Sequence, residues 1–183
     1  MSSADAPWRQ DLAPALLSVR FTVSEPVPVN RKYGRRKRAA DGGFGGKTGL
    51  FTRPEATRFE TAIGHAALAA RTRCPGWPTD PLRVVKARIS YQLYDYAGDV
   101  DGIRKPLRDA IQRVLIDNDR YVEDGPATFP IADGRGRRVD VYVELLELRS
   151  AEAARAIAVQ RTRAKIARLL IRSKLTALKP RVR

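Results

Sequence analysis

Three segments of the chain alternate apolar and polar residues with a period of two. In LSVRFTV (17–23) the odd-numbered residues are apolar and the residues between them are polar. The same alternation runs through VVKARISYQLY (84–94) and VDVYVELL (139–146). Each segment is therefore predicted to be a strand that is buried on one face only. A sheet covered by helices on both faces would contain continuous apolar runs, so we expect two layers and one open polar face.

Helical periodicity occupies the intervals between these strands. Thr52 and Glu55 have the spacing of a capping box, Pro54 suits a first turn, and apolar residues recur at helical spacing from Phe59 to Ala70. This pattern predicts a first helix over 52–71.

Two further helices are expected, over 101–115 and over 151–178, and Pro106 makes the start of the earlier one irregular. A short extra strand is expected around Tyr121 and Val122. The predicted fold class is therefore α/β, of the two-layer α+β kind. It has a small mixed sheet with helices on one face, in the order strand, helix, strand, helix, strand, followed by a basic C-terminal helix.

The positive charge of the chain is concentrated in two segments. The formal net charge of the 183 residues is +15, of which residues 31–53 contribute +7 and residues 150–183 contribute +9, leaving −1 for the rest. We therefore expect a domain over 1–149, with a basic Gly-rich arm at about 26–50, and a basic helical extension over 150–183. Such appendages favour binding to a polyanion through release of counterions, although improved solubility is the simpler alternative. The residues predicted to contact DNA are Arg31, Lys32, Arg35, Arg36, Lys37, Arg38, Lys47, Arg161, Lys165, Arg168 and Arg172.

Several common kinds of site are excluded because required residues are missing. DGGFGGKTG resembles a phosphate-binding loop but has Asp41 where its first glycine is needed. GDVDG aligned as a calcium loop puts Ala97 and Arg108 at ligand positions. One histidine, His65, and one cysteine, Cys74, make neither an ordinary zinc site nor an intrachain disulfide. No segment approaches membrane-spanning length, and the expected compartment is the cytoplasm.

The segment GDVDGIRKPLRDAIQRVLIDND (98–119) places five aspartates around one lysine. The first two aspartates are two residues apart at the end of a predicted strand, so they project to the same side if the chain stays extended. The lysine and the third aspartate follow at one-turn intervals on the predicted helix, and the last two come after it. The resulting cluster contains Asp99, Asp101, Lys105, Asp109, Asp117 and Asp119.

Such a cluster suits metal-assisted cleavage of a phosphodiester. Mg²⁺ binds to one or two carboxylates together with waters and substrate phosphates. A bound metal polarises the phosphate and generates a hydroxide, and a lysine stabilises the developing charge. The alternative is structural, with an aspartate at a helix N-terminus, an exposed loop and a solvated helix face.

The same residues carry a family resemblance. DVDGIRKPLRDAI followed by IDNDRYV resembles the signature of the RusA-type Holliday junction resolvases, D-x-D-N-x-x-K, then x-x-x-D-A-hydrophobic, then D-D-x-Q-V. The matching residues are Asp99, Asp101, Lys105, Asp109, Ala110 and Asp119. SEPVPVNRKY is similar to the family's Pro-rich turn, and FTRPEATRFE to the start of its first helix. The resemblance covers about residues 16–148.

The resemblance implies a small homodimeric α/β endonuclease of a bacterial or phage-infected cell. Members bind four-way DNA junctions and resolve them by paired nicks in recombination and repair, with Mg²⁺ as cofactor and Mn²⁺ as an alternative. It implies that Asp99, Asp101 and Asp119 are catalytic metal ligands and that Lys105 is the catalytic lysine. Asp109 and Asp117 are assigned supporting roles.

Two positions depart from the signature: Gly102 replaces an Asn, which we expect to loosen the corner between strand and helix, and Asn118 replaces an Asp. A second hypothesis is therefore kept, namely a non-catalytic protein that binds branched DNA on the same fold. An RNA-directed nuclease is weaker, because no RNA-recognition motif with interleaved aromatic residues is present.

Overall fold

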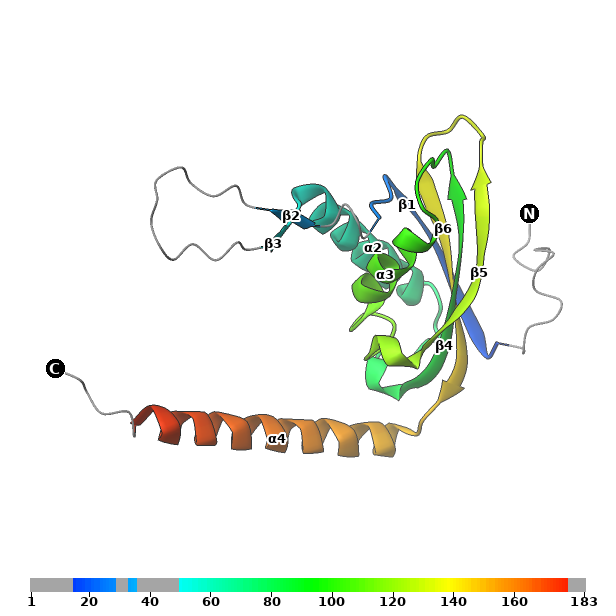
Figure 1. Ribbon diagram of the computed structural model, residues 1–183. Coiled ribbons are helices and arrows are strands. Elements are labelled where there is room, and N and C mark those ends of the chain that lie inside the picture. The colour runs from blue at the N-terminus through cyan, green and yellow to red at the C-terminus, as the bar shows by residue number, and fades with distance from the viewer. Residues whose placement is uncertain (1–14, 29–32, 36–49, 178–183) are drawn as a thin grey trace, which may run out of the picture. The chain divides into compact units, whose positions relative to one another are not determined.

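A computed structural model describes residues 15–28, 33–35 and 50–177 of the chain (Figure 1). The chain divides into two compact units, residues 1–148 and residues 149–183. The first unit contains the sheet and two helices, and the second contains one long helix. The predicted DNA contacts that fall outside the described residues are Arg31, Lys32, Arg36, Lys37, Arg38 and Lys47.

The first unit is built on a four-stranded mixed sheet. Its spatial order is β1 (Leu17–Ser24), β6 (Arg138–Leu148), β4 (Val84–Tyr94) and β5 (Val122–Ile131). β6 is antiparallel to both β1 and β4, whereas β5 is parallel to β4. All three predicted strands are present, and the α/β two-layer class is confirmed. Because parallel neighbours need a crossover connection, the chain forms a helix between β4 and β5.

β5 is a ten-residue strand where only a short strand was predicted. Its sequence VEDGPATFPI lacks a period-two pattern and contains Gly125, Pro126 and Pro130. Proline is tolerated because β5 lies at the edge of the sheet, where one row of backbone N–H groups needs no partner strand. Its register against β4 shifts twice, between Ile89 and Tyr91 and between Gln92 and Tyr94.

Helix α2 (Pro54–Thr72) begins two residues later than predicted. Arg53 stands at the N-cap without a side-chain capping bond, and Pro54 follows at the first helical position. Thr52 instead ends β3 (Leu50–Thr52), which pairs with β2 (Tyr33–Arg35). The predicted capping box is therefore wrong, because strand pairing takes the residue that it required.

Helix α3 (Asp101–Ile111) is shorter than the predicted 101–115. Pro106 lies inside it, and the chain leaves the helix before Arg113, whose φ of 65° is left-handed. The segment that follows is held by α2 and by the loop after it. Arg71 donates to the carbonyl of Val114 at 2.7 Å, and Trp77 donates to the carbonyl of Leu115 at 3.3 Å. Because these two carbonyls accept side-chain donors, the chain forms these bonds instead of a further turn of α3.

Helices α2 and α3 cover one face of the sheet (Figure 1). Beneath them lie the apolar residues of the alternating strands, such as Phe21, Ile89 and Val141, packed against Ile63 and Leu107. This core holds both helices against the same face of the sheet.

The other face of the sheet is polar, as predicted, but the polar side chains at its centre are buried rather than exposed to solvent. Arg88, Ser90, Asp140 and Glu144 are at most 6% exposed. Arg20 and Thr22 donate to Asp140 at 2.7 and 2.6 Å, and Arg88 pairs with Glu144 at 3.4 Å. Such cross-strand partners allow charge to be buried, because an unpaired buried charge is costly.

The second unit is helix α4 (Ala151–Ala177). The hydroxyl of Ser150 accepts the backbone N–H of Ala153 at 3.1 Å and so caps the start of the helix. Within the described ranges, no helix is long and apolar enough to cross a membrane.

Candidate functional site

A pocket of about 240 Å³ lies along the outer side of α3. Its walls combine α3 with the short 3₁₀ turn Asp119–Tyr121, which leads into β5. The structure therefore brings together residues ten or more positions apart, as the sequence analysis expected for the aspartate cluster. The lining residues are Asp101, Arg104, Lys105, Arg108, Asp109 and Asp119.

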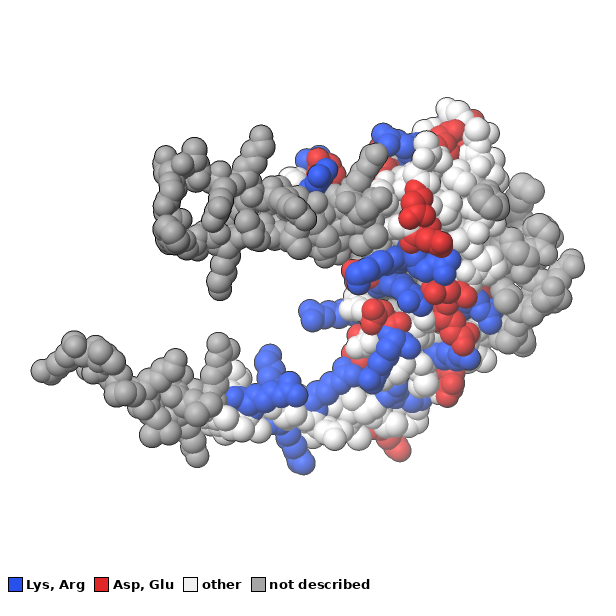
Figure 2. Space-filling view, in the orientation of Figure 1, with Lys and Arg blue, Asp and Glu red and all other residues white. Residues whose placement is uncertain are grey.

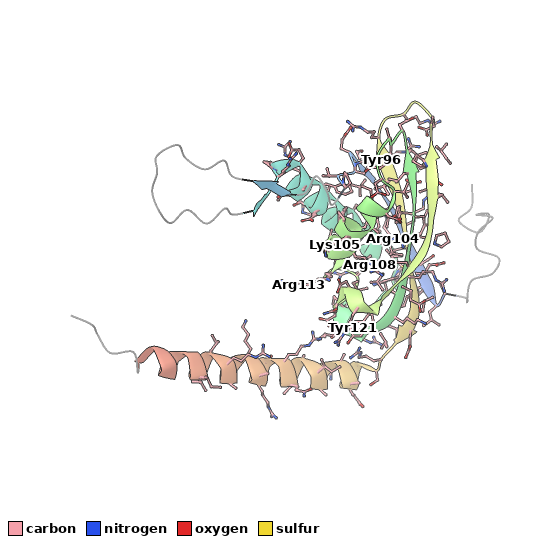
Figure 3. The ribbon with its side chains drawn as sticks, viewed as in Figure 1. Tyr96, Arg104, Lys105, Arg108, Arg113 and Tyr121 are labelled. Carbon is pink, nitrogen blue, oxygen red and sulfur yellow. The ribbon has the colours of Figure 1, made fainter. Side chains whose placement is uncertain are left out.

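The residues contributed by α3 share one helix face because they are spaced by three and four positions. Two ion pairs run along this face: Arg104 to Asp101 at 3.4 Å and Lys105 to Asp109 at 3.3 Å. Asp101 is the most open of these groups, with 81% of its side chain exposed. Figure 3 shows Arg104, Lys105 and Arg108 together on α3.

Asp124 of β5 joins two arginines of α3. It pairs with Arg104 at 3.1 Å and with Arg108 at 2.9 Å. Arg108 also donates to the carbonyl of Val122 at 2.6 Å, so it ties the helix to the start of the strand.

The sequence analysis missed Arg104, Arg108 and Asp124 as members of the site. The spacing of the two arginines from Asp101 and Lys105 was a usable signal, because positions 101, 104, 105 and 108 lie on one helix face. Asp124 gave none, since it lies in a strand without alternation.

The pocket carries equal numbers of acidic and basic side chains, three of each, so its formal charge is zero. Figure 2 shows acidic and basic side chains next to one another on this face of the first unit. Burial alone would lower the pKa of the Arg104 guanidinium, but its interactions with Tyr91 and Asp124 outweigh burial and raise that pKa above its ordinary value. Arg104 is therefore firmly cationic.

Asp99 does not line this pocket. Its Oδ1 atom accepts the backbone N–H of Asp101 at 3.1 Å, at the start of α3. It borders a separate pocket of about 400 Å³, whose wall also contains Tyr96 and Arg137. The structure thus divides the first two aspartates of the signature between two cavities.

Gly102, one of the two departures from the signature, is packed rather than loose. A Cβ atom there would stand 3.1 Å from the Pro28 Cβ atom and 3.4 Å from Oδ2 of Asp99. The corner between β4 and α3 is closed at this point, contrary to the expected loosening, and glycine allows the close approach.

Asn118, the other departure, caps the turn that carries Asp119. Its Oδ1 atom accepts the backbone N–H of Arg120 at 3.1 Å. Asp117 is partly buried and is not among the residues that line the pocket. Of the last two aspartates, Asp119 is thus the one at the site.

The carboxylates that line the pocket suit a hard cation such as Mg²⁺, but they supply only the small number of protein ligands that such an ion uses. Among the residues that the structure describes, no group of three or more His, Cys, Asp or Glu side chains is placed to hold a metal ion. Of the three carboxylates that line the pocket, Asp109 is paired with Lys105, and Asp101 and Asp119 are the two considered as ligands. Mg²⁺ is commonly held by one or two carboxylates plus water and phosphate oxygens.

Helix α4 carries a basic stripe. Arg161, Lys165 and Arg168 are exposed and recur at spacings of four and three, so they share one face of the helix. Arg172 continues the same spacing within α4, and Arg35 lies in β2, but their side chains are outside those described.

An apolar stripe occupies the opposite side of α4. Val159, Ile166 and Leu170 are 51%, 52% and 58% exposed, and their spacings of seven and four place them on one face. Position 161 is turned by about 200° from position 159, so the two stripes point in opposite directions.

Comparison of the chain with models of known protein families and with curated proteins gives no match.

Proposed function

We propose that this protein is a Mg²⁺-dependent endonuclease that cuts branched DNA, with four-way junctions as its substrate and paired nicks as its outcome. The observation that carries the proposal is the convergence of Asp101, Asp119 and Lys105 on one pocket beside two arginines. The resemblance of residues 99–119 to the RusA-type signature supports the same reaction.

In this proposal Asp101 and Asp119 hold the metal, which supplies a polarised phosphate and an activated water when bound. Lys105 stabilises the negative charge that develops on the phosphate. Asp109 pairs with the Lys105 ammonium group at 3.3 Å, and in this proposal it orients that lysine. Asp99 organises the start of α3 through its bond to the backbone of Asp101.

The basic stripe of α4 supplies DNA affinity in the same proposal. Its exposed cations neutralise phosphates, and Glu152 is the one acidic residue in the sequence of α4. The Gly-rich arm adds further cations.

Paired nicks need two active sites, so we also propose a homodimer. The apolar stripe of α4 offers a second copy an apolar surface, and pairing there would leave the basic stripe free for DNA. Sedimentation velocity of the intact protein and of the Ile166→Gln, Leu170→Gln variant tests this. If the variant still forms a dimer, the interface does not lie on the apolar stripe of α4.

One observation favours a second candidate, a non-catalytic protein that binds branched DNA. Asp101 and Asp109 are already paired with Arg104 and Lys105, and the pocket is formally neutral. A neutral pocket attracts a divalent cation less than a strongly acidic one does.

The deciding experiment is cleavage of a labelled four-way junction, a flap and a plain duplex by the purified full chain, with Mg²⁺ and with EDTA. Under the nuclease proposal, symmetric cuts form in the junction only with Mg²⁺. Binding without cuts on any substrate, with Mg²⁺ or with Mn²⁺, would instead support the second candidate.

A further inference from the structure

Two guanidinium groups form part of the wall of the pocket on α3. Arg104 and Arg108 have 27% and 26% of their side chains exposed, and both line the pocket. They are four residues apart on one helix face, so their side chains run side by side. Their positions were not among the DNA contacts expected from the sequence.

A shared carboxylate holds this arginine pair in place. The two oxygens of Asp124 are divided between the arginines, with Oδ2 on Arg104 and Oδ1 on Arg108. Arg108 is held further by the carbonyl of Val122. The two arginines and Asp124 together carry a formal charge of +1, whereas the lining of the whole pocket is neutral. Their long side chains are already ordered by these contacts, so little side-chain entropy is lost on binding.

The pair also retains unused donors. A guanidinium has five N–H donors. Within the described part of the chain, the Nε atoms of Arg104 and Arg108 are buried without an acceptor, and the hydrogen bond and ion pair of Arg108 both use Nη2 rather than Nη1. The contact of Arg104 with Asp101 is long, at 3.4 Å, and Asp101 is mostly exposed. The donors that a ligand in the pocket can use are therefore Nη1 of Arg108 and, in place of the long contact with Asp101, Nη2 of Arg104.

We propose that Arg104 and Arg108, positioned by Asp124, form a phosphate-binding site that binds its ligand in the absence of metal; we call it the seat. Guanidinium groups donate charge-assisted hydrogen bonds to phosphate oxygens, and two of them side by side offer a phosphate one donor each. Free phosphate and the phosphodiester of a nucleic acid share this chemistry. The identity of DNA as the natural ligand rests on the proposed function, whereas the seat itself does not.

The seat lies beside the carboxylate pair proposed for the metal. Asp101 and Asp119 line the same pocket as the two arginines. A phosphodiester bound by the arginine pair therefore presents its oxygens to the site of cutting. Arg104 and Arg108 thus select the anion, and Asp124 is a positioning residue.

The test is nuclear magnetic resonance of the ¹⁵N-labelled full chain in EDTA. Buried Nε–H groups exchange slowly with water, so the Nε–H signals of Arg104 and Arg108 are suited to observation and are assigned with Arg104→Lys and Arg108→Lys. Inorganic phosphate and thymidylyl-thymidine are titrated separately, each at constant ionic strength maintained with chloride. Both signals should shift to saturation with one dissociation constant, and the signal of the exposed Arg73 should not.

Variants separate a specific seat from general charge. Arg108→Gln should weaken phosphate binding about tenfold, because a charge-assisted bond is lost, while Arg108→Lys should fall between it and the wild type. Arg73→Gln is the matched control. The remaining signals of each spectrum show whether the variant is folded. Arg104→Gln tests the contribution of the other arginine to phosphate binding in the same way. Linear shifts that are equal at all arginines would overturn the seat.

The titration and the cleavage assay test the seat and the nuclease activity separately, so either proposal can be overturned without the other. Saturable phosphate binding without cutting of any DNA would retain the seat and overturn the nuclease. Cutting that is unchanged in Arg108→Gln, without shifts on phosphate, would overturn the seat and retain the nuclease. Binding of thymidylyl-thymidine but not of inorganic phosphate would identify the diester as the ligand.

Discussion

Oδ1 of Asp99 accepts the backbone N–H of Asp101 at 3.1 Å, so the carboxylates of these two aspartates have different surroundings. The Asp101 carboxylate projects from the first residue of α3 and is 81% exposed. The Asp99 carboxylate is turned back toward the chain and borders a different cavity.

Asp101→Asn should reduce cleavage of a four-way junction by about 10²-fold or more, because it removes the charge of a proposed metal ligand. Asp99→Asn retains an oxygen that accepts the same backbone bond, so it should keep most of the cutting. Initial rates on labelled junctions with Mg²⁺ measure both, and both variants should keep junction binding in EDTA.

Two further variants complete that comparison. Asp99→Ala loses the acceptor of the Asp101 backbone N–H and should destabilise the fold by about 0.5–1.5 kcal/mol, the net contribution of one hydrogen bond. Glu147→Gln, an exposed acid at the far end of β6, is the matched control for loss of one charge. Equal loss of cutting in Asp99→Asn and Asp101→Asn would show that Asp99 is a metal ligand, as the family resemblance implies.

Gly125 follows Asp124 in β5 and lies against Ser90 of β4. A Cβ atom at position 125 would collide with Oγ of Ser90, and it would stand 3.0 Å from the carbonyl oxygen of Ile89. Gly125→Ala should therefore force β5 away from β4 and lower the free energy of unfolding by about 1–3 kcal/mol. Urea denaturation measures the loss.

Gly64→Ala is the matched control for that substitution. Gly64 lies in α2, and an added Cβ there would have only an ordinary contact, 3.9 Å from the carbonyl oxygen of Ala110. Alanine in a helix should stabilise the protein by about 0.5–1 kcal/mol. If both variants were equally stable, the close approach of the strands at Gly125 would not matter.

The basic stripe of α4 should set the salt dependence of DNA binding. Replacing Arg161, Lys165 and Arg168 with Gln should make the slope of log affinity against log salt shallower by about 2–3, since each lost phosphate contact contributes about 0.9. Fluorescence anisotropy with a labelled junction between 50 and 300 mM salt, roughly the range in which such slopes are resolved, measures this.

A charge-conserving variant controls for loss of helix surface. Arg161→Lys with Arg168→Lys keeps the charge and should keep the slope. Glutamine and lysine have similar helix propensities, so circular dichroism should show the same helix content in both variants. An unaltered slope in the glutamine variant would exclude this face of α4 from the DNA interface.

The turn between β5 and β6 should make the fold sensitive to acid. The hydrogen bond from Arg138 is the largest cause that lowers the pKa of Asp133 below its ordinary value. A carboxyl whose pKa is lowered on folding stabilises the protein above its unfolded pKa, and this contribution is lost as the pH falls below about 4.

Asp133→Asn should therefore be less stable than the wild type at pH 6, and the difference should shrink between pH 4 and pH 2. Thermal unfolding at fixed ionic strength across that range measures the convergence. Glu25→Gln, at an exposed ion pair with Arg137, is the control and should follow the wild type more closely. A difference that stays constant with pH would show that the Arg138 contact contributes nothing to acid sensitivity.

Local patterning was enough to predict three strands of the sheet and their apolar face. VVKARISYQLY was predicted as a strand over 84–94, and β4 has those bounds, because period-two alternation directly encodes the burial of one face. The helices were located by the same logic. Their ends were less accurate, since Thr52 is taken by strand pairing and the segment after α3 is held by Arg71 and Trp77.

The sequence by itself therefore determined the layer architecture, the gathering of aspartates near α3 and the separation of basic segments from a near-neutral body. Only the tertiary structure decided that Asp101 and Asp119 line one pocket, that Asp99 accepts the backbone N–H of Asp101, and that Asp124 joins Arg104 to Arg108. The reason is physical. Periodicity reports which face of an element is buried, whereas these contacts depend on how β5, an edge strand without periodicity, pairs beside β4.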